Sequence, residues 1–479
     1  MVVPTVAAIT LLGGFLRFYN LGRESLWLDE GTSIWIAHLN WHSLWKLLST
    51  SEANMAPYYL LLHFWILCGD SEAIARSLSA LAGTATIAVV FLLGQRMFNA
   101  RAALIASFLL ALNTFHIRYS QEARGYSLAA LLTAVSCLFL VRAIQRESRF
   151  DWLCYVLVSA LSVYAHFFAA LVIAAQWISF VALPPRSIRW RQLALCVGAV
   201  ALLCTPLAVY VLFVDHATHL DWIPRPSLQA LYSLFDEFAG PDKRLLIAFY
   251  GLTSLAGMIW GLREWRRPKD ALGRWHFVLV TSWFFFPILL TFVVSQWSPL
   301  FVDRFLLVSL PALALLAAFG LSRVCPGVEA VLLLAIVLLW QCRVLKTYES
   351  VQVKEDWRGS SAYILSQETP ADALVFYEPG CQREFAYYAR REGRTAEIGT
   401  ILEANFQAPR QDGPLPTDLP RRFPRVWLIQ THLFKQELQD KGAAIRAFLA
   451  RQYRSATKES FRGVEVYLYS AGPERSVHP

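Results

Sequence analysis

The chain has 479 residues, with 44 Lys and Arg against 35 Asp and Glu, which gives a formal net charge of +9. Hydrophobic residues make up 56% and charged residues only 16%, whereas soluble domains carry about 25% charged residues. This composition excludes a disordered chain, a coiled coil and an ordinary soluble enzyme, and it predicts a polytopic membrane protein. The positive charge indicates no nucleic-acid partner, because basic residues concentrate in the cytoplasmic loops of membrane proteins.

Apolar runs predict membrane-spanning helices along the first three quarters of the chain. The eleven expected spans lie near 3–19, 73–94, 102–115, 126–142, 152–166, 167–183, 193–214, 245–262, 275–294, 304–321 and 328–344. The stretch Pro57–Leu67 is too short for a crossing and is expected to lie at the interface or to re-enter the membrane. The 8 Cys form no CxxC pair and fall mostly in apolar runs, so neither a disulfide framework nor a zinc site is expected.

The basic residues of alternate loops predict the orientation of these spans. One set of loops is expected to be cytoplasmic because it contains Arg96, Arg101, Arg142, Arg146, Arg149, Arg186, Arg189, Arg191, Arg263, Arg266, Arg267, Lys269, Arg274 and Arg323. The opposite loops (20–72, 116–125, 215–243 and 295–303) and the tail are then extracytoplasmic. The first run lacks a basic n-region and an A-x-A site, so we expect an uncleaved span in the plasma (inner) membrane.

The tail differs from the rest of the chain because charge density rises and long apolar runs stop. Strands are expected at 374–379, 426–430 and 464–470, and helices at 356–367 and 435–453. Pro and Gly residues at 407–424 predict a long loop. We therefore expect a transmembrane catalytic domain at 1–344 and a small extracytoplasmic α/β domain at 345–479.

Two adjacent acids follow the first span in the run FYNLGRESLWLDEGTS (18–33). Asp29 and Glu30 are flanked by apolar and aromatic residues, and a partly dry carboxylate is more basic and suits general-base work. The alternative is that Asp29 caps a short interfacial helix that starts near Gly31. The loop alone leaves both interpretations open.

A second polar cluster lies in FHIRYSQEARGYS (115–127), between two spans. Arg118 and Arg124 could hold a phosphate while Glu122 orients a ligand, and Gln121 and Tyr126 are further candidates for substrate binding. Alternatively, Glu122 could form a structural ion pair with one of these arginines. Charged groups beside lipid cost about 2.5–3.5 kcal/mol at the bilayer centre, so such a cluster calls for an explanation.

Two more outer segments carry polar residues. His216, His219 and Asp221 could ligate a metal ion, although an isolated HxxH is a weak signal. Trp222 more plausibly belongs to a stiff loop over a substrate site. Arg304 begins a span and could meet an anionic phosphate or could snorkel to the interface.

Nucleotide-binding motifs are absent from the sequence, which contains neither a Walker A motif nor a GxGxxG followed by a βαβ unit. The expected cytoplasmic loops are also too short for a nucleotide-binding domain. An enzyme of this kind would therefore take its activated substrate from the membrane.

Several runs together resemble the bacterial glycosyltransferase family 39-like proteins, which are GT-C enzymes related to protein mannosyltransferases, aminoarabinose transferases and rhizobial core transferases. They are LWLDE (26–30), APYYLLLHFW (56–65), SEAIARSLSALAGTATIAVVFLLGQRMF (71–98), YSQEARGYS (119–127), WIPRPS (222–227), DRFLLVSLPALALLAA (303–318) and EDWRGSSAYI (355–364). The likeness covers almost the whole chain. One departure is that relatives usually have Lys or Arg before the first span, whereas this chain has none.

The resemblance implies an all-α polytopic GT-C fold of about eleven transmembrane helices with a small C-terminal α/β domain. It also implies an enzyme that takes a sugar from a polyprenyl-phosphate donor on the outer face. Asp29 would then be the general base, with Glu30 beside it and Glu122 as the acid of the second outer loop. Arg118, Arg124 and Arg304 would contact the phosphate.

The chemistry of such a donor predicts inversion, because attack opposite the phosphate inverts the anomeric carbon. The phosphate is a good leaving group that needs only positive charge, and a carboxylate can take the acceptor proton. The acceptor could be a glycan, a lipid or a protein, and no cofactor is implied beyond a divalent metal ion that Glu122 could bind. A transporter or flippase of lipid-linked saccharides is the alternative function, although no internal repeat supports it.

Overall fold

The structure is a computed structural model of the chain. It describes residues 2–183, 190–213, 223–240, 244–266, 272–350, 354–377, 379–394, 399–403, 415, 418–431 and 436–472. Contacts divide the chain into two units, Met1–Leu21 with Leu39–Val351 and Gly22–His38 with Gln352–Pro479. We call these the membrane unit and the tail unit. The expected division between residues 344 and 345 remains a prediction about folding domains.

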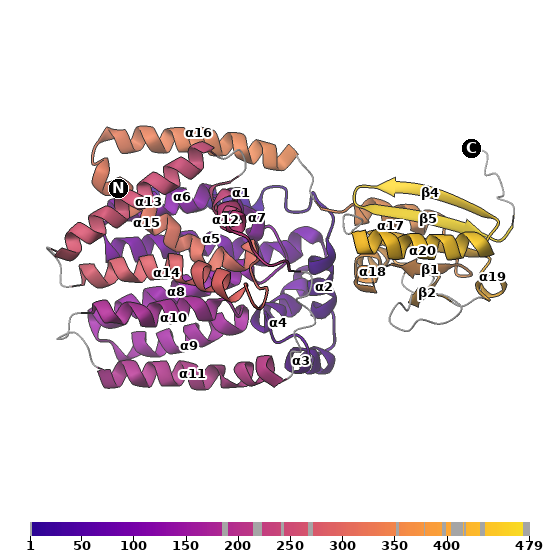
Figure 1. Cartoon of the computed structure of the whole chain (residues 1–479), viewed down its shortest axis with the longest axis horizontal. Coiled ribbons are helices and arrows are strands. Elements are labelled where there is room, and N and C mark those ends of the chain that lie inside the picture. Colours follow the sequence, from indigo (N-terminus) through magenta and orange to yellow (C-terminus); the bar gives the residue numbers. More distant parts are fainter. Residues whose placement is uncertain are drawn as a thin grey trace. The chain divides into compact units, whose positions relative to one another are not determined.

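The membrane unit is a bundle of helices, many of which run along one another (Figure 1). Its α-helices are α1 (Val2–Phe18), α3 (Trp41–Thr50), α4 (Ala56–Trp65), α5 (Glu72–Met97), α6 (Ala100–Leu112), α7 (Thr114–Ser120), α8 (Tyr126–Arg146), α9 (Arg149–Ala165), α10 (Ala169–Ser179), α11 (Trp190–Phe213), α12 (Leu228–Ala239), α13 (Arg244–Arg266), α14 (Gly273–Val294), α15 (Leu310–Val324) and α16 (Val328–Ser350). Short 3₁₀ turns include η1 (Ile66–Cys68), η2 (Phe180–Ala182) and η5 (Asp303–Ser309).

Each of the eleven predicted spans overlaps one of these helices. Among the described residues, six helices are long and apolar enough to cross a membrane, or up to seven if the bent pair α6–α7 counts as one span. Shorter apolar helices are Val2–Phe18, Ala56–Cys68 and Ala169–Ala182, and the second of these coincides with the stretch expected at the interface. The all-helical membrane architecture is thus confirmed, whereas the number of crossings remains a prediction.

Side-chain caps set several helix boundaries in the membrane unit. The side chains of Ser71, Asn99 and Ser148 accept hydrogen bonds from backbone N–H groups in the first turns of α5, α6 and α9. Asn113 does the same for α7, and its own backbone is extended, so α6 ends there. The axis bends by 60° at this point. Polar residues between apolar runs therefore mark the helix starts, as capping preferences predict.

The tail unit is a three-layer α/β/α structure with a five-stranded sheet of order β2-β1-β3-β5-β4. The strands are β1 (Ala373–Phe376), β2 (Thr400–Glu403), β3 (Arg425–Thr431), β4 (Ser455–Phe461) and β5 (Val464–Ser470). β1 pairs in parallel with β2 and β3, whereas β5 pairs antiparallel with β3 and β4. Its helices are α2 (Leu28–Ala37), α17 (Trp357–Gln367), α18 (Gln382–Arg391), α19 (Leu419–Arg422) and α20 (Gln436–Gln452), with the 3₁₀ turn η6 (Pro379–Cys381).

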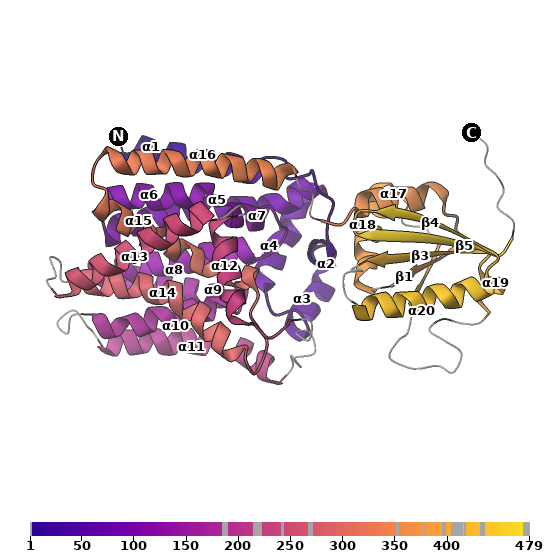
Figure 2. The same cartoon turned by 45° about the horizontal axis from the view of Figure 1, so that its top comes forward.

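Helices cover both faces of this sheet, with α17 and α18 on one side and α20 on the other (Figure 2). Val375, Leu428 and Ile445 belong to the core on the α20 side, whereas the ring of Trp427 meets that of Tyr363 in α17. The three strands and two helices expected in the tail are confirmed, and β2, β4 and α18 are additions. β4 was not predicted because its central residues are exposed and its sequence therefore lacks the alternation of apolar and polar residues. Most of the loop expected at 407–424 lies outside the described residues.

Candidate active site

The second polar cluster follows the bend between α6 and α7. The buried side chain of Arg17 contacts the residues at this bend. Arg17 in α1 donates from Nη1 to Ala111 O (3.0 Å) and from Nη2 to Leu110 O (3.0 Å), and Nη2 lies 2.9 Å from Nδ1 of His116. Carbonyls at the end of a helix lack intrahelical partners, so these bonds satisfy α6 where it stops. Arg17 and His116 therefore serve the local structure of the bend.

Three of the predicted binding residues come together beside the start of α8. Arg304 donates from Nε to the Tyr126 hydroxyl (3.0 Å), and the Arg124 guanidinium lies 5.7 Å from the centre of the Tyr126 ring. Arg124 also donates from Nη1 to the hydroxyl of Tyr59 in α4 (3.1 Å). Arg304 is thus held against α8 rather than extended along the helix surface. We call Tyr59, Arg124, Tyr126 and Arg304 the arginine–tyrosine cluster.

The other residues of the second loop point to different neighbours. Gln121 donates from Nε2 to Tyr19 O (2.9 Å) and Leu16 O (3.2 Å), so its amide satisfies carbonyls at the end of α1. Arg118 lies 3.8 Å from Glu237 of α12, and both side chains keep contact with solvent. Glu122 is buried. The substrate-binding roles of Gln121, Arg118 and Glu122 remain predictions.

The first acidic pair lies in the opening turn of α2, within the tail unit. α2 begins at Leu28 and Trp27 occupies its N-cap position, without a side-chain capping bond. Asp29 therefore lies inside the first turn, and its interpretation as the helix cap is wrong. Carboxylates in a first helical turn are stabilised by the helix dipole. Glu30 is 0% exposed and forms a 3.0 Å ion pair with Lys354, whereas Asp29 is only partly buried. The two adjacent acids therefore have different environments.

Other tail residues fix α2 in this unit. The backbone N–H of Leu26 donates to the Tyr388 hydroxyl (2.9 Å), and Arg383 donates to Oγ1 of Thr32 (2.9 Å). The Arg383 guanidinium also lies 4.4 Å from the centre of the Trp35 ring. Residues of α18 thus hold the helix that carries Asp29.

Glu384 of α18 is an unusual buried acid next to α2. A Cβ atom on Gly31 would collide with its carboxyl group, so the two helices meet closely there. Both of its carboxyl oxygens are buried without a hydrogen-bond partner among the described residues. Burial raises the pKa of Glu384 well above its usual range, and the charges of Glu355 and Asp29 raise it further while that of Arg383 lowers it.

Two of the predicted features cannot be placed. Trp222 lies outside the described residues, and so do His216, His219 and Asp221. Within the part of the chain that the structure describes, no group of three or more His, Cys, Asp or Glu side chains could hold a metal ion. A metal role for Glu122 therefore gains no support from the described neighbours.

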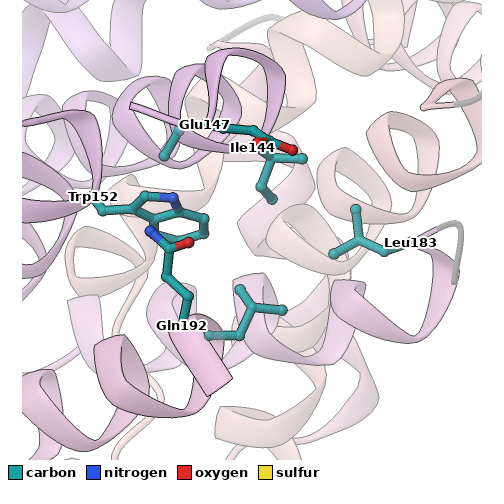
Figure 3. A pocket seen from close by; sticks show the side chains of 7 residues that line it. Ile144, Glu147, Trp152, Leu183 and Gln192 are labelled. Atoms are coloured by element: carbon teal, nitrogen blue, oxygen red, sulfur yellow. The ribbon is translucent and has the colours of Figure 1, made fainter. Parts of the chain in front are cut away.

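Cavities in the membrane unit differ in size and lining. One near the α8–α9 turn, lined by Ile144, Glu147, Trp152, Leu183 and Gln192 among others, measures about 20 Å³ (Figure 3). A water molecule occupies a cavity of about that size, so this one is too small for a substrate. Another, lined by residues of α12 to α15, measures about 360 Å³ and is almost wholly apolar, with Tyr232, Phe235, Met258 and Phe284 in its wall.

The sequence did not single out several residues that the structure places beside these features. Tyr59 belongs to the arginine–tyrosine cluster, His166 contacts it, and Lys354 pairs with Glu30. His166 carried a signal, since it is a polar residue between two apolar spans at their predicted outer ends. Tyr59 and Lys354 carried none, because their partners are distant in sequence.

Comparisons with known proteins agree with this architecture. Residues 52–210, about a third of the chain, match the sequence profile of the family described as dolichyl-phosphate-mannose-protein mannosyltransferase. The comparison with curated protein sequences gives no match. ArnT from Cupriavidus metallidurans is similar in structure, with 16% identity, a TM-score of 0.63, and coverage of 98% of this chain and 99% of ArnT.

The chain has the GT-C fold. Archaeal AglB from Archaeoglobus fulgidus matches with 12% identity and a TM-score of 0.59 over 100% of this chain and 75% of AglB. The mycobacterial arabinofuranosyltransferase AftD matches with 15% identity and a TM-score of 0.51 over 99% of this chain and 42% of AftD. The GT-C fold that the resemblance implied is therefore confirmed.

Proposed function

We propose that the protein transfers a sugar from a polyprenyl-phosphate donor to an acceptor on the extracytoplasmic side of the membrane, with inversion at the anomeric carbon. The observation that carries the proposal is the arginine–tyrosine cluster, in which Arg304 and Arg124 contact Tyr126 beside the start of α8. The similar protein ArnT has also been solved bound to undecaprenyl phosphate, which supports the same class of donor here.

The proposed donor suits the charge of this cluster. When the acceptor attacks, the bond from the anomeric carbon to the phosphate oxygen breaks, and negative charge develops on the departing polyprenyl phosphate. Two guanidinium groups stabilise that charge without giving up a proton, and fixed cations in a site of low dielectric are effective in this role. The apolar cavity bordered by α12 to α15 offers a lining suited to a hydrocarbon chain.

Asp29 is the proposed general base. Its neighbour Glu30 is fully buried and paired with Lys354, so Glu30 is the less suitable proton acceptor. Asp29 is partly exposed in the same helical turn. It would take the proton from the acceptor hydroxyl as the new glycosidic bond forms, a step that general bases accelerate about 10²- to 10⁴-fold.

The test is mass spectrometry of envelope lipids and glycans from cells with the wild-type protein, with no protein, and with Asp29→Asn. We expect one glycan or lipid to lose a single sugar in both the null and the Asp29→Asn strains. Asp70→Asn makes the same chemical change in the same predicted outer loop and is the matched control, for which a normal product is expected. Normal product in Asp29→Asn would remove Asp29 from the mechanism.

A transporter would give a different result in this experiment. A lipid-linked saccharide would then change its distribution between the leaflets in the null strain while every transfer product kept its mass. That outcome, together with a silent Asp29→Asn substitution, would replace the transferase proposal.

A further inference from the structure

His166 is a buried histidine that touches the arginine–tyrosine cluster and has no role in the proposed chemistry so far. It lies in the turn between α9 and α10 and is 2% exposed. The centre of its ring is 5.7 Å from that of Tyr126 and 5.1 Å from that of Phe305. Since Phe305 follows Arg304, the imidazole lies between two of the elements that build the cluster.

The hydrogen bonds of His166 fix its tautomer. The backbone N–H of Phe168 donates to Nδ1 over 3.2 Å, so Nδ1 is the acceptor nitrogen and the ring proton is on Nε2. Nε2 is buried and, among the described residues, has no hydrogen-bond partner. A buried N–H donor without an acceptor is costly and rare, and it requires an explanation.

The turn itself does not need this donor. The backbone N–H of His166 donates to Ser162 O (3.0 Å), and its carbonyl accepts from the N–H of Ala169 (2.9 Å). The N–H of Phe167 donates to Oδ1 of Asn54 (3.3 Å). An apolar ring would pack equally well against Tyr126 and Phe305, so the local fold explains the ring but not the polar Nε2 atom.

The surroundings of His166 indicate what acceptor would complete it. Arg304 and Arg124 both contact Tyr126, whose ring centre is 5.7 Å from that of His166. The Arg304 guanidinium also lies 5.6 Å from the centre of the Phe305 ring. Guanidinium groups are donors only, as is the N–H at Nε2. Two fixed positive charges near this N–H donor favour an anionic acceptor, and a phosphate monoester provides several acceptor oxygens.

We propose that His166 is a donor-binding residue whose Nε2–H group donates a hydrogen bond to a phosphate oxygen of the polyprenyl-phosphate substrate. The inference rests on the proposed function, because it assigns this residue to the phosphate of that donor. In this role His166 donates a hydrogen bond and transfers no proton, so its contribution is to binding and orientation. The proposed ligand is the polyprenyl phosphate, rather than free phosphate or a bilayer phospholipid, because it is the donor in the proposed function.

Two variants of similar size separate the hydrogen bond from packing. His166→Gln keeps an N–H donor near the position of Nε2, whereas His166→Met has no donor. Binding of undecaprenyl phosphate to the full-length protein in phosphatidylcholine nanodiscs should weaken about 10- to 100-fold in His166→Met, the range for a hydrogen bond to a charged group. His166→Gln should retain most of the affinity, and the donor KM should follow the same order while the acceptor KM stays constant.

His276→Met is the matched control, since His276 is equally buried at 2% exposure but lies in α14, and it should bind the lipid normally. Equal affinity of His166→Met and His166→Gln would overturn the role of His166, provided that the wild type binds. No binding by the wild-type protein would instead overturn the proposed function. Equal competition by inorganic phosphate or by phosphatidylglycerol vesicles would overturn the assignment to a polyprenyl phosphate.

Discussion

The two adjacent acids of α2 show how one residue's partner decides its role. Glu30 and Asp29 are neighbours in sequence, yet Glu30 is enclosed and paired with Lys354 while Asp29 is partly open. A buried carboxylate without its counter-charge is strongly destabilising, because desolvation is then uncompensated. We infer that Glu30 stabilises the helix that presents Asp29.

Replacing Lys354 tests this division of roles. Lys354→Met should lower the free energy of unfolding by about 3 kcal/mol. This is the low end of the range for breaking a buried ion pair, because Lys354 keeps some contact with solvent. The double variant Lys354→Met with Glu30→Gln should recover most of that loss, since the buried charge is gone. Thermal unfolding in detergent measures both, with Lys354→Arg as a control that retains the charge. Equal unfolding temperatures for wild type and Lys354→Met would show that the pair contributes nothing.

We expect Glu384 to make the stability of the tail unit depend on pH. Because its pKa is raised in the folded protein, the folded state holds a proton that the unfolded state releases above about pH 4.3. This contribution to stability is therefore complete below that pH and is lost as the pH rises toward the folded pKa, by about 1.4 kcal/mol per pH unit. The free energy of unfolding falls with rising pH in this range because the native state binds more protons than the unfolded state.

Glu384→Gln removes the titration while keeping the shape of the side chain. The variant should be more stable than the wild type at pH 7, and the advantage should grow as the pH rises above about 5 toward the folded pKa of Glu384. Thermal unfolding at a series of pH values measures the difference. A difference that does not change with pH would mean that Glu384 is not held neutral by its surroundings.

The candidate site residues could be chosen from the sequence, whereas their partners could not. Asp29, Arg124, Tyr126 and Arg304 stood out because polar groups beside apolar spans are costly, which is a local signal. The separate environments of Asp29 and Glu30 depend on Lys354, more than 300 residues away along the chain, and no local pattern reports such a contact. The partners of Gln121 at the end of α1 could not be predicted for the same reason, because they are about a hundred residues away along the chain.

At the level of elements, periodic apolar runs located the helices but not how closely they pack. α13 and α15 meet at Gly257 and Gly320, where a Cβ atom on Gly320 would overlap Thr253 O and Gly257 N. Small residues allow such close approach between membrane helices, where dispersion contacts replace the hydrophobic effect. In the tail, β2 was missed because a strand of four residues carries little pattern of its own. Helix α18 did carry a signal, since Phe385, Tyr388 and Ala389 recur at helical spacing and are buried.

Gly320→Ala tests this helix contact. The added methyl group meets backbone atoms, which cannot rotate away, so α13 and α15 must separate, at a cost of about 1–3 kcal/mol. Gly251→Ala in α13 is the matched control because nothing lies within 4 Å of its added Cβ atom. Its effect should stay within about 0.5 kcal/mol or be slightly favourable, since Ala is the better helix former. Similar unfolding temperatures for the two variants would contradict the close packing.

At the scale of the whole molecule, the proposed chemistry depends on orientation. A polyprenyl-phosphate donor is used outside only if the arginine–tyrosine cluster and Asp29 are on the extracytoplasmic side. The distribution of Lys and Arg over the loops makes that prediction, since the turn between α8 and α9 carries Arg142, Arg146 and Arg149 and should therefore be cytoplasmic. The turn between α14 and η5 should then be outside.

Single cysteines in a Cys-free background test this topology in intact cells. Ser298→Cys, in the exposed turn after α14, should react with a membrane-impermeant maleimide added from outside. Arg149→Cys, exposed at the start of α9, should react only after the cells are permeabilised. Because the two positions lie on loops of opposite predicted sides, each is the control for the other. The reverse pattern would place the arginine–tyrosine cluster on the cytoplasmic side, and the donor would then have to be available on that face.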